Sequence, residues 1–171
     1  LSKNTSPFVT PTVYRSVSGV LVTNYVRGTM LSSMIESYVN EDHELESRVH
    51  SLLGTIMTDL SEFHLKSRSK GDLERPIGRV HGDFDPWQIL VADSSYTVID
   101  WEDSIESAEQ YSDVLSFIFM TAIIGSQSRK LSDRVTSVLN PEPRVSSLLR
   151  HALETYTESD NSTAKDLLNY T

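Results

Sequence analysis

Residues 81–103 read HGDFDPWQILVADSSYTVIDWED, and this stretch decides the fold. The apolar runs 89–91 and 96–99 are typical of β-strands, and the turn residues between them predict a hairpin. Because antiparallel neighbours run in opposite directions, the loop before the first strand lies beside the segment after the second. The sequence therefore predicts that residues 81–88 and 100–103 meet at one end of the hairpin.

Five carboxylates fall within these two segments, and their charges limit what the meeting point can bind. They are Asp83, Asp85, Asp100, Glu102 and Asp103. Clustered carboxylates repel one another unless a cation lies between them. A hard divalent ion such as Mg²⁺ is the natural occupant of such a cluster. The sequence thus predicts that the five side chains converge on a magnesium site.

The rest of the chain predicts an α+β fold that is mainly α. A first hairpin is expected over residues 12–17 and 20–26, around a Ser-Gly turn. Five further stretches have apolar residues at helical spacing. These predicted helices cover residues 31–38, 49–63, 111–124, 132–139 and 144–156. Ser112 or Asp113 is predicted to cap the third of them, and the polar stretches 2–11 and 67–76 are predicted to be irregular.

Composition excludes several classes of protein. The chain has 171 residues and no Cys, which rules out a disulfide framework, a zinc ribbon and a cysteine nucleophile. Its 24 acidic and 15 basic residues give a net charge of −9, which argues against binding to a nucleic-acid backbone. We expect a cytoplasmic protein without membrane contact, because the sequence contains neither a signal peptide nor a spanning segment. We interpret the chain as a fragment, because it begins with Leu1 rather than Met.

The two acidic segments also carry a family resemblance. The pattern H-G-D-x-x-P before I-L, then a short turn and V-I-D-W-E, resembles the catalytic segment of the aminoglycoside phosphotransferase and choline kinase family. That family has the protein-kinase-like fold. Residues 21–31 are similar to its hinge, residues 60–64 to its L-x-x-L-H helix end, and residues 111–115 to the helix that follows its metal loop. The matching motifs stand in the family's order.

The resemblance implies the large, C-terminal lobe of such an enzyme, with small β-hairpins. Residues 1–30 would be the end of the small lobe and the hinge strands. Residues 31–171 would form the helical large lobe, with the catalytic loop at 81–90 and the metal loop at 100–103. The implied reaction is transfer of the γ-phosphate of ATP or GTP to a hydroxyl or amino group of a small acceptor. An aminoglycoside, a choline-like molecule or a sugar would fit, and the acidic surface would attract a cationic acceptor.

The resemblance also assigns roles to single residues. Asp83 would be the catalytic base, and Gln88 and Asp100 would hold Mg²⁺. Backbone groups at Asn24, Tyr25 and Val26 would bind the base of the nucleotide. The remaining site residues, in supporting roles, would be His81, Asp85, Trp101, Glu102 and Asp113.

Two departures from the family pattern leave an alternative open. The family has Asn where this chain has Gln88, whose amide lies one methylene further out. A phosphate-binding lobe needs a Gly-rich turn and a strand Lys. No two of the seven glycines stand close together, and Lys3 is the only lysine before the hinge, so most of the small lobe is expected in the rest of the full-length chain. The fragment alone is expected to be inactive. The alternative is a pseudokinase-like binding or regulatory domain.

Overall fold

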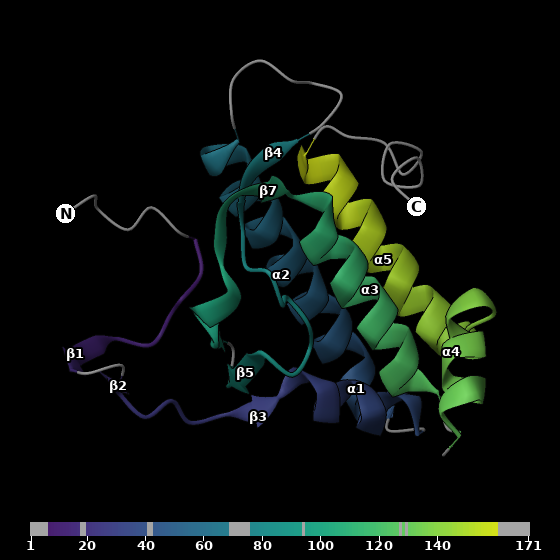
Figure 1. Cartoon of the computed structure of the whole chain (residues 1–171). Coiled ribbons are helices and arrows are strands. Elements are labelled where there is room, and N and C mark those ends of the chain that lie inside the picture. The colour runs from purple at the N-terminus through teal and green to yellow at the C-terminus, as the bar shows by residue number, and fades with distance from the viewer. Residues whose placement is uncertain are drawn as a thin grey trace.

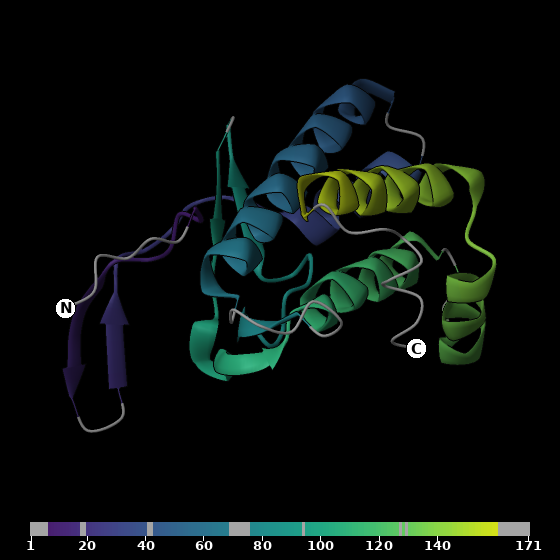
Figure 2. The same cartoon turned by 90° about the horizontal axis from the view of Figure 1, so that it is seen from above.

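A computed structural model describes residues 7–17, 20–40, 43–68, 76–93, 95–126, 128 and 130–160. Within these ranges the fold is α+β and mainly helical, with five α-helices and three small antiparallel sheets. The helices form one body, and an N-terminal β-hairpin extends away from it (Figures 1 and 2). None of the described helices is both long and apolar enough to cross a membrane.

Two long helices pack side by side at the centre of the body: α2 (Glu46–Ser67) and α5 (Pro143–Asp160) (Figure 1). Each turns an apolar stripe inward, because its apolar residues recur every three or four positions. The buried stripe of α2 consists of Val49, Leu53, Ile56, Met57, Leu60 and Phe63, and that of α5 of Val145, Leu148, Ala152 and Tyr156. Both helices were predicted, and each is longer than its apolar stripe.

Three further helices complete the body: α1 (Leu31–Val39), α3 (Tyr111–Gly125) and α4 (Leu131–Leu139). The helix α3 packs against α1, α4 and α5. Its N-cap position is Gln110, which makes no capping side-chain bond, so the prediction of a cap at Ser112 or Asp113 is wrong. The carboxylate of Asp113 is instead bound to the loop that begins at His81.

The two predicted hairpins are present. The first consists of β1 (Val13–Val17) and β2 (Val20–Thr23), and its turn lies outside the described residues. The second consists of β5 (Ile89–Ala92) and β6 (Ser95–Val98), in which Ile89 pairs with Val98. A two-residue strand, β3 (Thr29–Met30), pairs with the other edge of β5 and leads into α1.

One sheet was not predicted. The strand β4 (Ile77–Val80) pairs antiparallel with β7 (Ile105–Glu109), and Val80 pairs with Ile105. The side chains of β7 are almost all solvent-exposed, so its sequence has no apolar alternation to indicate a strand. This sheet matters for the site because β4 ends directly before His81. Two short 3₁₀ turns, His43–Leu45 and Trp101–Asp103, were also not predicted.

The N-terminal segment has no regular structure in its described part, as predicted, yet it belongs to the core. Phe8 is buried and contacts the rings of Phe63, Phe84 and Trp101. The carbonyl of Val9 accepts a hydrogen bond of 3.0 Å from the amide of Val98. Of the second stretch predicted to be irregular, residues 69–75 lie outside the described residues.

Candidate functional site

The loop before β5 and the segment after β6 meet, as the hairpin predicted. The imidazole of His81 donates from Nε2 to the carbonyl of Ile99 at 2.9 Å, and its ring centroid lies 4.5 Å from that of Trp101. The amide of Ile99 donates to the carbonyl of Gln88 at 2.9 Å. Gly82 (φ +93°) packs against the backbone of Asp103 so closely that a Cβ there would overlap its carbonyl oxygen. His81 therefore holds the two segments together.

A second sheet fixes the same two segments from the other side. The ladder between β4 and β7 brackets the chain before His81 and after Ser104, and the ladder between β5 and β6 brackets it after Gln88 and before Ile99. Residues 81–88 and 99–104 are thus held at both ends by neighbouring strands. Such anchoring keeps the backbone of an irregular segment in one arrangement at low entropic cost.

Asp113 binds the backbone at the start of the loop that carries Asp83. Its carboxylate is buried and accepts the amide of His81 on Oδ2 at 2.8 Å and the amide of Gly82 on Oδ1 at 3.0 Å. These two peptide groups directly precede Asp83, so the backbone that carries Asp83 is fixed to the first turn of α3. Asp113 thus binds the backbone of the loop and does not cap its own helix.

Asp83 and Gln88 contact each other. The Gln88 side chain donates from Nε2 to Asp83 Oδ2 at 3.1 Å, and both residues are partly exposed. This bond orients the Asp83 carboxylate and leaves the amide oxygen of Gln88 as a further hard ligand atom. The loop is tightened by a weaker bond of 3.4 Å from the amide of Asp83 to Nδ1 of His81.

Asp85 points into its own loop. It is only 6% exposed, and its Oδ1 accepts the amide of Trp87 at 2.7 Å. Burial raises the pKa of this carboxyl above its ordinary value of 3.8, although the bond from Trp87 acts in the opposite direction. Asp85 is therefore a structural residue of the loop.

The pKa of Asp85 gives a testable prediction. Because the folded protein holds this proton more tightly than the unfolded chain, the free energy of unfolding falls as the pH rises through and above 3.8. Asp85→Asn keeps the acceptor for Trp87 and removes the buried charge. We expect it to raise stability at pH 7 by up to about 1 kcal/mol, and less at pH 4. Thermal melting at both pH values measures this. Asp103→Asn, at an exposed position, is the control, and a large destabilisation by Asp85→Asn at pH 7 would contradict the assignment.

Asp100 adopts an unusual backbone conformation at the end of β6. Its φ of 62° and ψ of 55° place it in the left-handed region, and its side chain is exposed. Asp93, in the turn at the other end of the hairpin, is the only other non-glycine residue with positive φ among the described residues. A left-handed residue costs about 1 kcal/mol or more, and such strain gathers at functional sites.

The prediction that five carboxylates converge on one ion is wrong. Within the described part of the chain, no three His, Asp or Glu side chains are grouped closely enough to hold a metal. Asp85 accepts the amide of Trp87, and Glu102 and Asp103 lie in a short 3₁₀ turn in which no residue is buried. The hard oxygen ligands that remain are Asp100 and the Gln88 amide oxygen. Two protein ligands suit Mg²⁺, which keeps several waters and binds phosphate oxygens.

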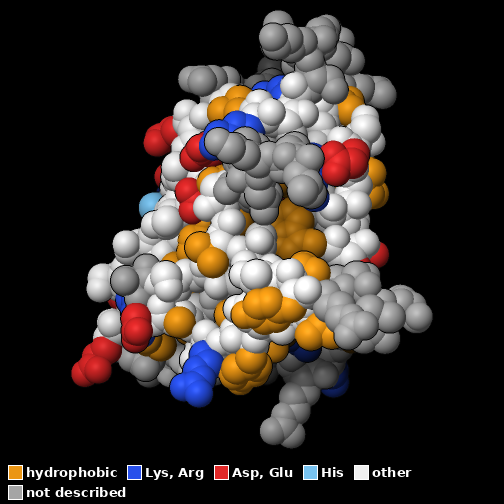
Figure 3. Space-filling model, turned by 90° about the vertical axis from the view of Figure 1, so that its left-hand side faces the viewer, with side chains coloured by type: hydrophobic (Ala, Val, Ile, Leu, Met, Phe, Trp, Pro, Cys, Tyr) orange, Lys and Arg blue, Asp and Glu red, His pale blue; other side chains and the backbone are white. Residues whose placement is uncertain are grey.

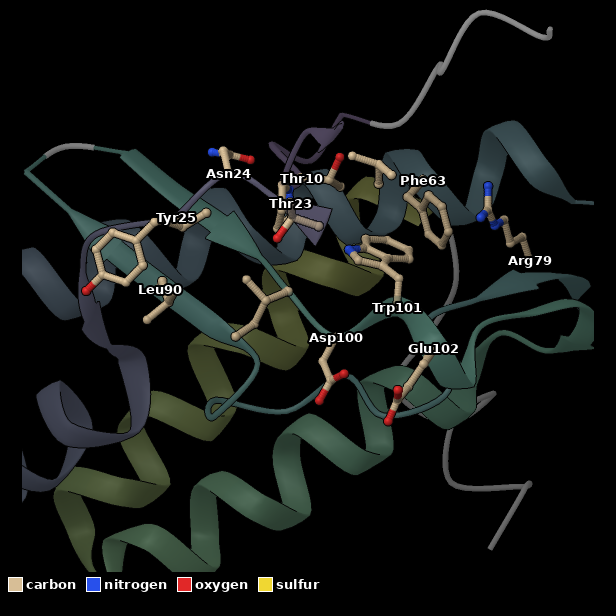
Figure 4. A pocket seen from close by; sticks show the side chains of 14 residues that line it. Thr10, Thr23, Asn24, Tyr25, Phe63, Arg79, Leu90, Asp100, Trp101 and Glu102 are labelled. Carbon is tan, nitrogen blue, oxygen red and sulfur yellow. The ribbon is translucent and has the colours of Figure 1, made fainter. Parts of the chain in front are cut away.

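A cavity of about 920 Å³ lies between residues 23–26 and the segment after β6. Figure 4 shows Asn24 and Tyr25 on one side of it and Asp100, Trp101 and Glu102 facing them. Val26 also lines the cavity, whereas Asp83 and Gln88 are not among the described residues that do. The cavity therefore brings the predicted base-binding residues together with Asp100.

Among the described residues, the backbone directly after β2 has unpaired groups at this cavity. Asn24 is used structurally, since its amide donates to the carbonyl of Thr12 at 3.0 Å and its Oδ1 accepts the amide of Thr12 at 2.5 Å. Tyr25 and Val26 make no such backbone pairing within the described chain. Their peptide groups are available to a planar, hydrogen-bonding ligand, whereas the amide of Asn24 is not.

Sequence reasoning missed much of the cavity lining. Phe63 and Arg79 line it from α2 and β4, and the Arg79 guanidinium lies 5.9 Å from the ring centroid of Trp101 (Figure 4). The others not predicted are Thr10, Pro11, Val13, Thr23, Leu90 and Ile99. Trp101 donates its indole N–H to the carbonyl of Val98 at 3.1 Å. No protein-family model matches the sequence, and a search of curated proteins finds no significant match.

Proposed function

We propose that this chain is the hinge and large lobe of a small-molecule phosphotransferase with the protein-kinase-like fold. The observation that carries the proposal is the pairing of two loops: one presents Asp83, the other presents Asp100 in a strained conformation, and His81 joins them. A cavity leads from Asp100 to free peptide groups of the hinge at Tyr25 and Val26. Positioning and charge placement are what phosphoryl transfer requires of a protein.

Each part has a task in this reaction. The peptide groups of Tyr25 and Val26 bind the base of ATP or GTP, and the cavity holds the nucleoside. Asp83 accepts the proton of the acceptor hydroxyl as its oxygen bonds to the γ-phosphorus, and the bond from that phosphorus to the bridging oxygen breaks to release the nucleoside diphosphate. Gln88 orients the Asp83 carboxylate through its side-chain amide. Asp100 and the Gln88 amide oxygen would hold Mg²⁺, which offsets the charge of the phosphates when bound.

The exposed N-terminal hairpin supports a further part of the proposal. Val13, Tyr14, Val22 and Tyr25 are all exposed, Tyr25 at 85%, and hydrophobic side chains gather on this side of the molecule (Figure 3). A two-stranded sheet is marginal by itself and needs further strands or a packing partner. We assign this surface to a small lobe in the full-length protein, which supplies the phosphate-binding lysine. A small cationic acceptor and a cytoplasmic location fit this proposal.

The test uses the full-length protein with Mg²⁺ and nucleotide. Asp100→Asn keeps the shape of the side chain and its tolerance of left-handed backbone. We expect Mg²⁺ to add much less to the thermal shift caused by ATP or GTP in this variant, with an apparent affinity for the metal complex lowered by about tenfold or more.

Asp93→Asn is a closely matched control. It changes the same residue type in the same backbone region at the opposite end of the same hairpin. Its Mg²⁺-dependent shift should equal that of the natural protein. An Asp100→Asn variant that keeps the full Mg²⁺-dependent shift would exclude Asp100 as a ligand.

One observation favours the alternative of a pseudokinase-like binding or regulatory domain. The carboxylate proposed as the base already accepts a hydrogen bond from Gln88, where the family has Asn. In this alternative the nucleotide still binds and raises the melting temperature, but no phosphate is transferred to any acceptor in a hydroxyl and amino panel. Nucleotide binding without turnover in the full-length protein would favour it over the enzyme.

A further inference from the structure

A chain of buried hydrogen bonds leads from the last described helix to the loop of Asp83. Tyr156 in α5 contacts Nδ1 of His64 at 2.8 Å through its hydroxyl. His64 Nε2 contacts Asp113 Oδ2 at 3.2 Å. Asp113 then binds the amides of His81 and Gly82. Tyr156 and His64 are 0% exposed and Asp113 is 1% exposed, so the bonds among these three side chains are shielded from bulk solvent.

The donor and the acceptor of each bond in this hydrogen-bond network can be assigned, starting from Asp113. The Asp113 carboxylate accepts hydrogen bonds from both loop amides and from the N–H at Nε2 of His64. The Nδ1 of His64 is then an acceptor, and the Tyr156 hydroxyl donates to it. Burial raises the pKa of Tyr156 well above its ordinary value, which keeps this donor protonated at any physiological pH. Both sides therefore donate to Asp113: Tyr156 through His64, and the loop through its two amides.

A second set of hydrogen bonds fixes the helices that carry this network. Arg68, just after α2, binds Asp160 of α5 at 2.6 Å and donates from Nε to Gln110 at 3.0 Å. Gln110 in turn donates to the carbonyl of His64 at 2.7 Å. The end of α2, the end of α5 and the start of α3 are therefore fixed to one another around His64.

We propose that Tyr156 and His64 are positioning residues for the loop that carries Asp83, and that they act through Asp113. The expected effect on kcat rests on the proposed function. The coupling between Tyr156 and the loop amides does not depend on it. The carboxylate of Asp113 has two oxygens for three N–H donors, so the orientation of His64 determines how Oδ2 is shared with the His81 amide. Holding that imidazole requires a partner on its other nitrogen, which Tyr156 supplies.

Tyr156, His64 and Asp113 are polar although they are buried, and this distinguishes a positioning role from simple packing. A buried polar group costs free energy unless it is paired, and apolar side chains would fill the same space without that cost. The bonds of Tyr156 and His64 lead to Asp113, whose carboxylate binds the two amides before Asp83. The helix α5 therefore contributes to the geometry of a loop that it reaches only through His64 and Asp113.

The test is Tyr156→Phe in the full-length protein, with amide hydrogen exchange as the first readout. The ring stays, and only the hydroxyl is lost. We expect the amides of His81 and Gly82 to exchange about tenfold faster, because one buried bond that orients their acceptor is missing. Amides in the buried middle of α2, at Leu53, Ile56 and Met57, report global stability and should change less. Tyr38→Phe, at an equally buried tyrosine in α1, is the control and should leave the loop amides unchanged.

Three outcomes overturn the coupling. These are unchanged exchange at the loop, equal acceleration at the loop and in the middle of α2, and the same acceleration in the control. Should Tyr156→Phe fail to fold, nitrogen NMR of His64 in the natural protein decides: a neutral ring with its proton on Nε2 supports the coupling, and a proton on Nδ1 overturns it.

Kinetics then separates the coupling from the proposed function. If the protein is a phosphotransferase, Tyr156→Phe should lower kcat by about tenfold and leave the nucleotide KM unchanged, because the cavity is untouched. A raised KM at constant kcat would contradict a positioning role. If no variant or natural protein transfers phosphate, the proposed function fails while faster exchange at residues 81–82 still supports the coupling.

Discussion

Asp83→Asn is expected to lower the turnover of phosphoryl transfer by about a thousandfold, which is the usual contribution of a general base. The amide oxygen of Asn still accepts the bond from Gln88, so the loop keeps its shape, but the side chain no longer accepts a proton. Nucleotide affinity should be unchanged, because Asp83 is not among the described residues that line the cavity. A coupled assay of the full-length protein with Mg²⁺ and an acceptor panel measures both quantities.

The matched control removes an equivalent charge away from the site. Glu158 is exposed in α5, and Glu158→Gln should retain the activity of the natural protein. Full activity in Asp83→Asn would exclude this residue as the base. A parallel loss of nucleotide binding would instead indicate that Asp83 holds the metal complex rather than the acceptor.

Gly82→Ala is expected to cause the largest loss of stability among single substitutions in the loop, about 3 kcal/mol. Two causes act together. Gly82 has a φ of +93°, which side chains rarely adopt, and a Cβ at this position would overlap the carbonyl oxygen of Asp103. That oxygen belongs to the backbone, so it moves only if the two segments separate. The melting temperature should fall by roughly 6–12 °C.

Gly54→Ala is the control for this prediction. Gly54 lies inside α2, where alanine is the better helix former, and its nearest neighbour is the flexible ring of His151, at 3.2 Å from the added Cβ. We expect a change within about 1 kcal/mol in either direction. Equal melting of the two variants would show that the contact between Gly82 and Asp103 is not a constraint in solution.

Local patterns explain what could be predicted. The hairpin of β5 and β6 depends on two apolar runs and the turn between them, all within a few residues. Its register alone brings Gln88 beside Ile99, and hence the loop of Asp83 beside Asp100. The helices α2 and α5 could also be predicted, because the helical spacing of their apolar residues is visible within a single segment.

Contacts between distant segments explain what could not be predicted. The pairing of β4 with β7 joins residues about thirty positions apart, and neither strand has a clear pattern. Phe8 lies in a segment without regular structure, and only its burial against aromatic rings reveals its role. Asp113 lies where a helix cap is expected from the sequence, but its carboxylate binds the amides of His81 and Gly82 instead.

The two ladders that bracket the site have a consequence for how this region can vary. With β4 paired to β7 and β5 paired to β6, the loops join two sheets, and the strands on either side of residues 81–88 carry buried side chains: Val80 in β4, and Ile89 and Val91 in β5. An inserted or deleted residue in either loop has to be absorbed by a one-residue slip, which would turn these side chains toward solvent. Residues 81–88 can therefore change their chemistry by substitution, but their number is fixed by the strands on either side.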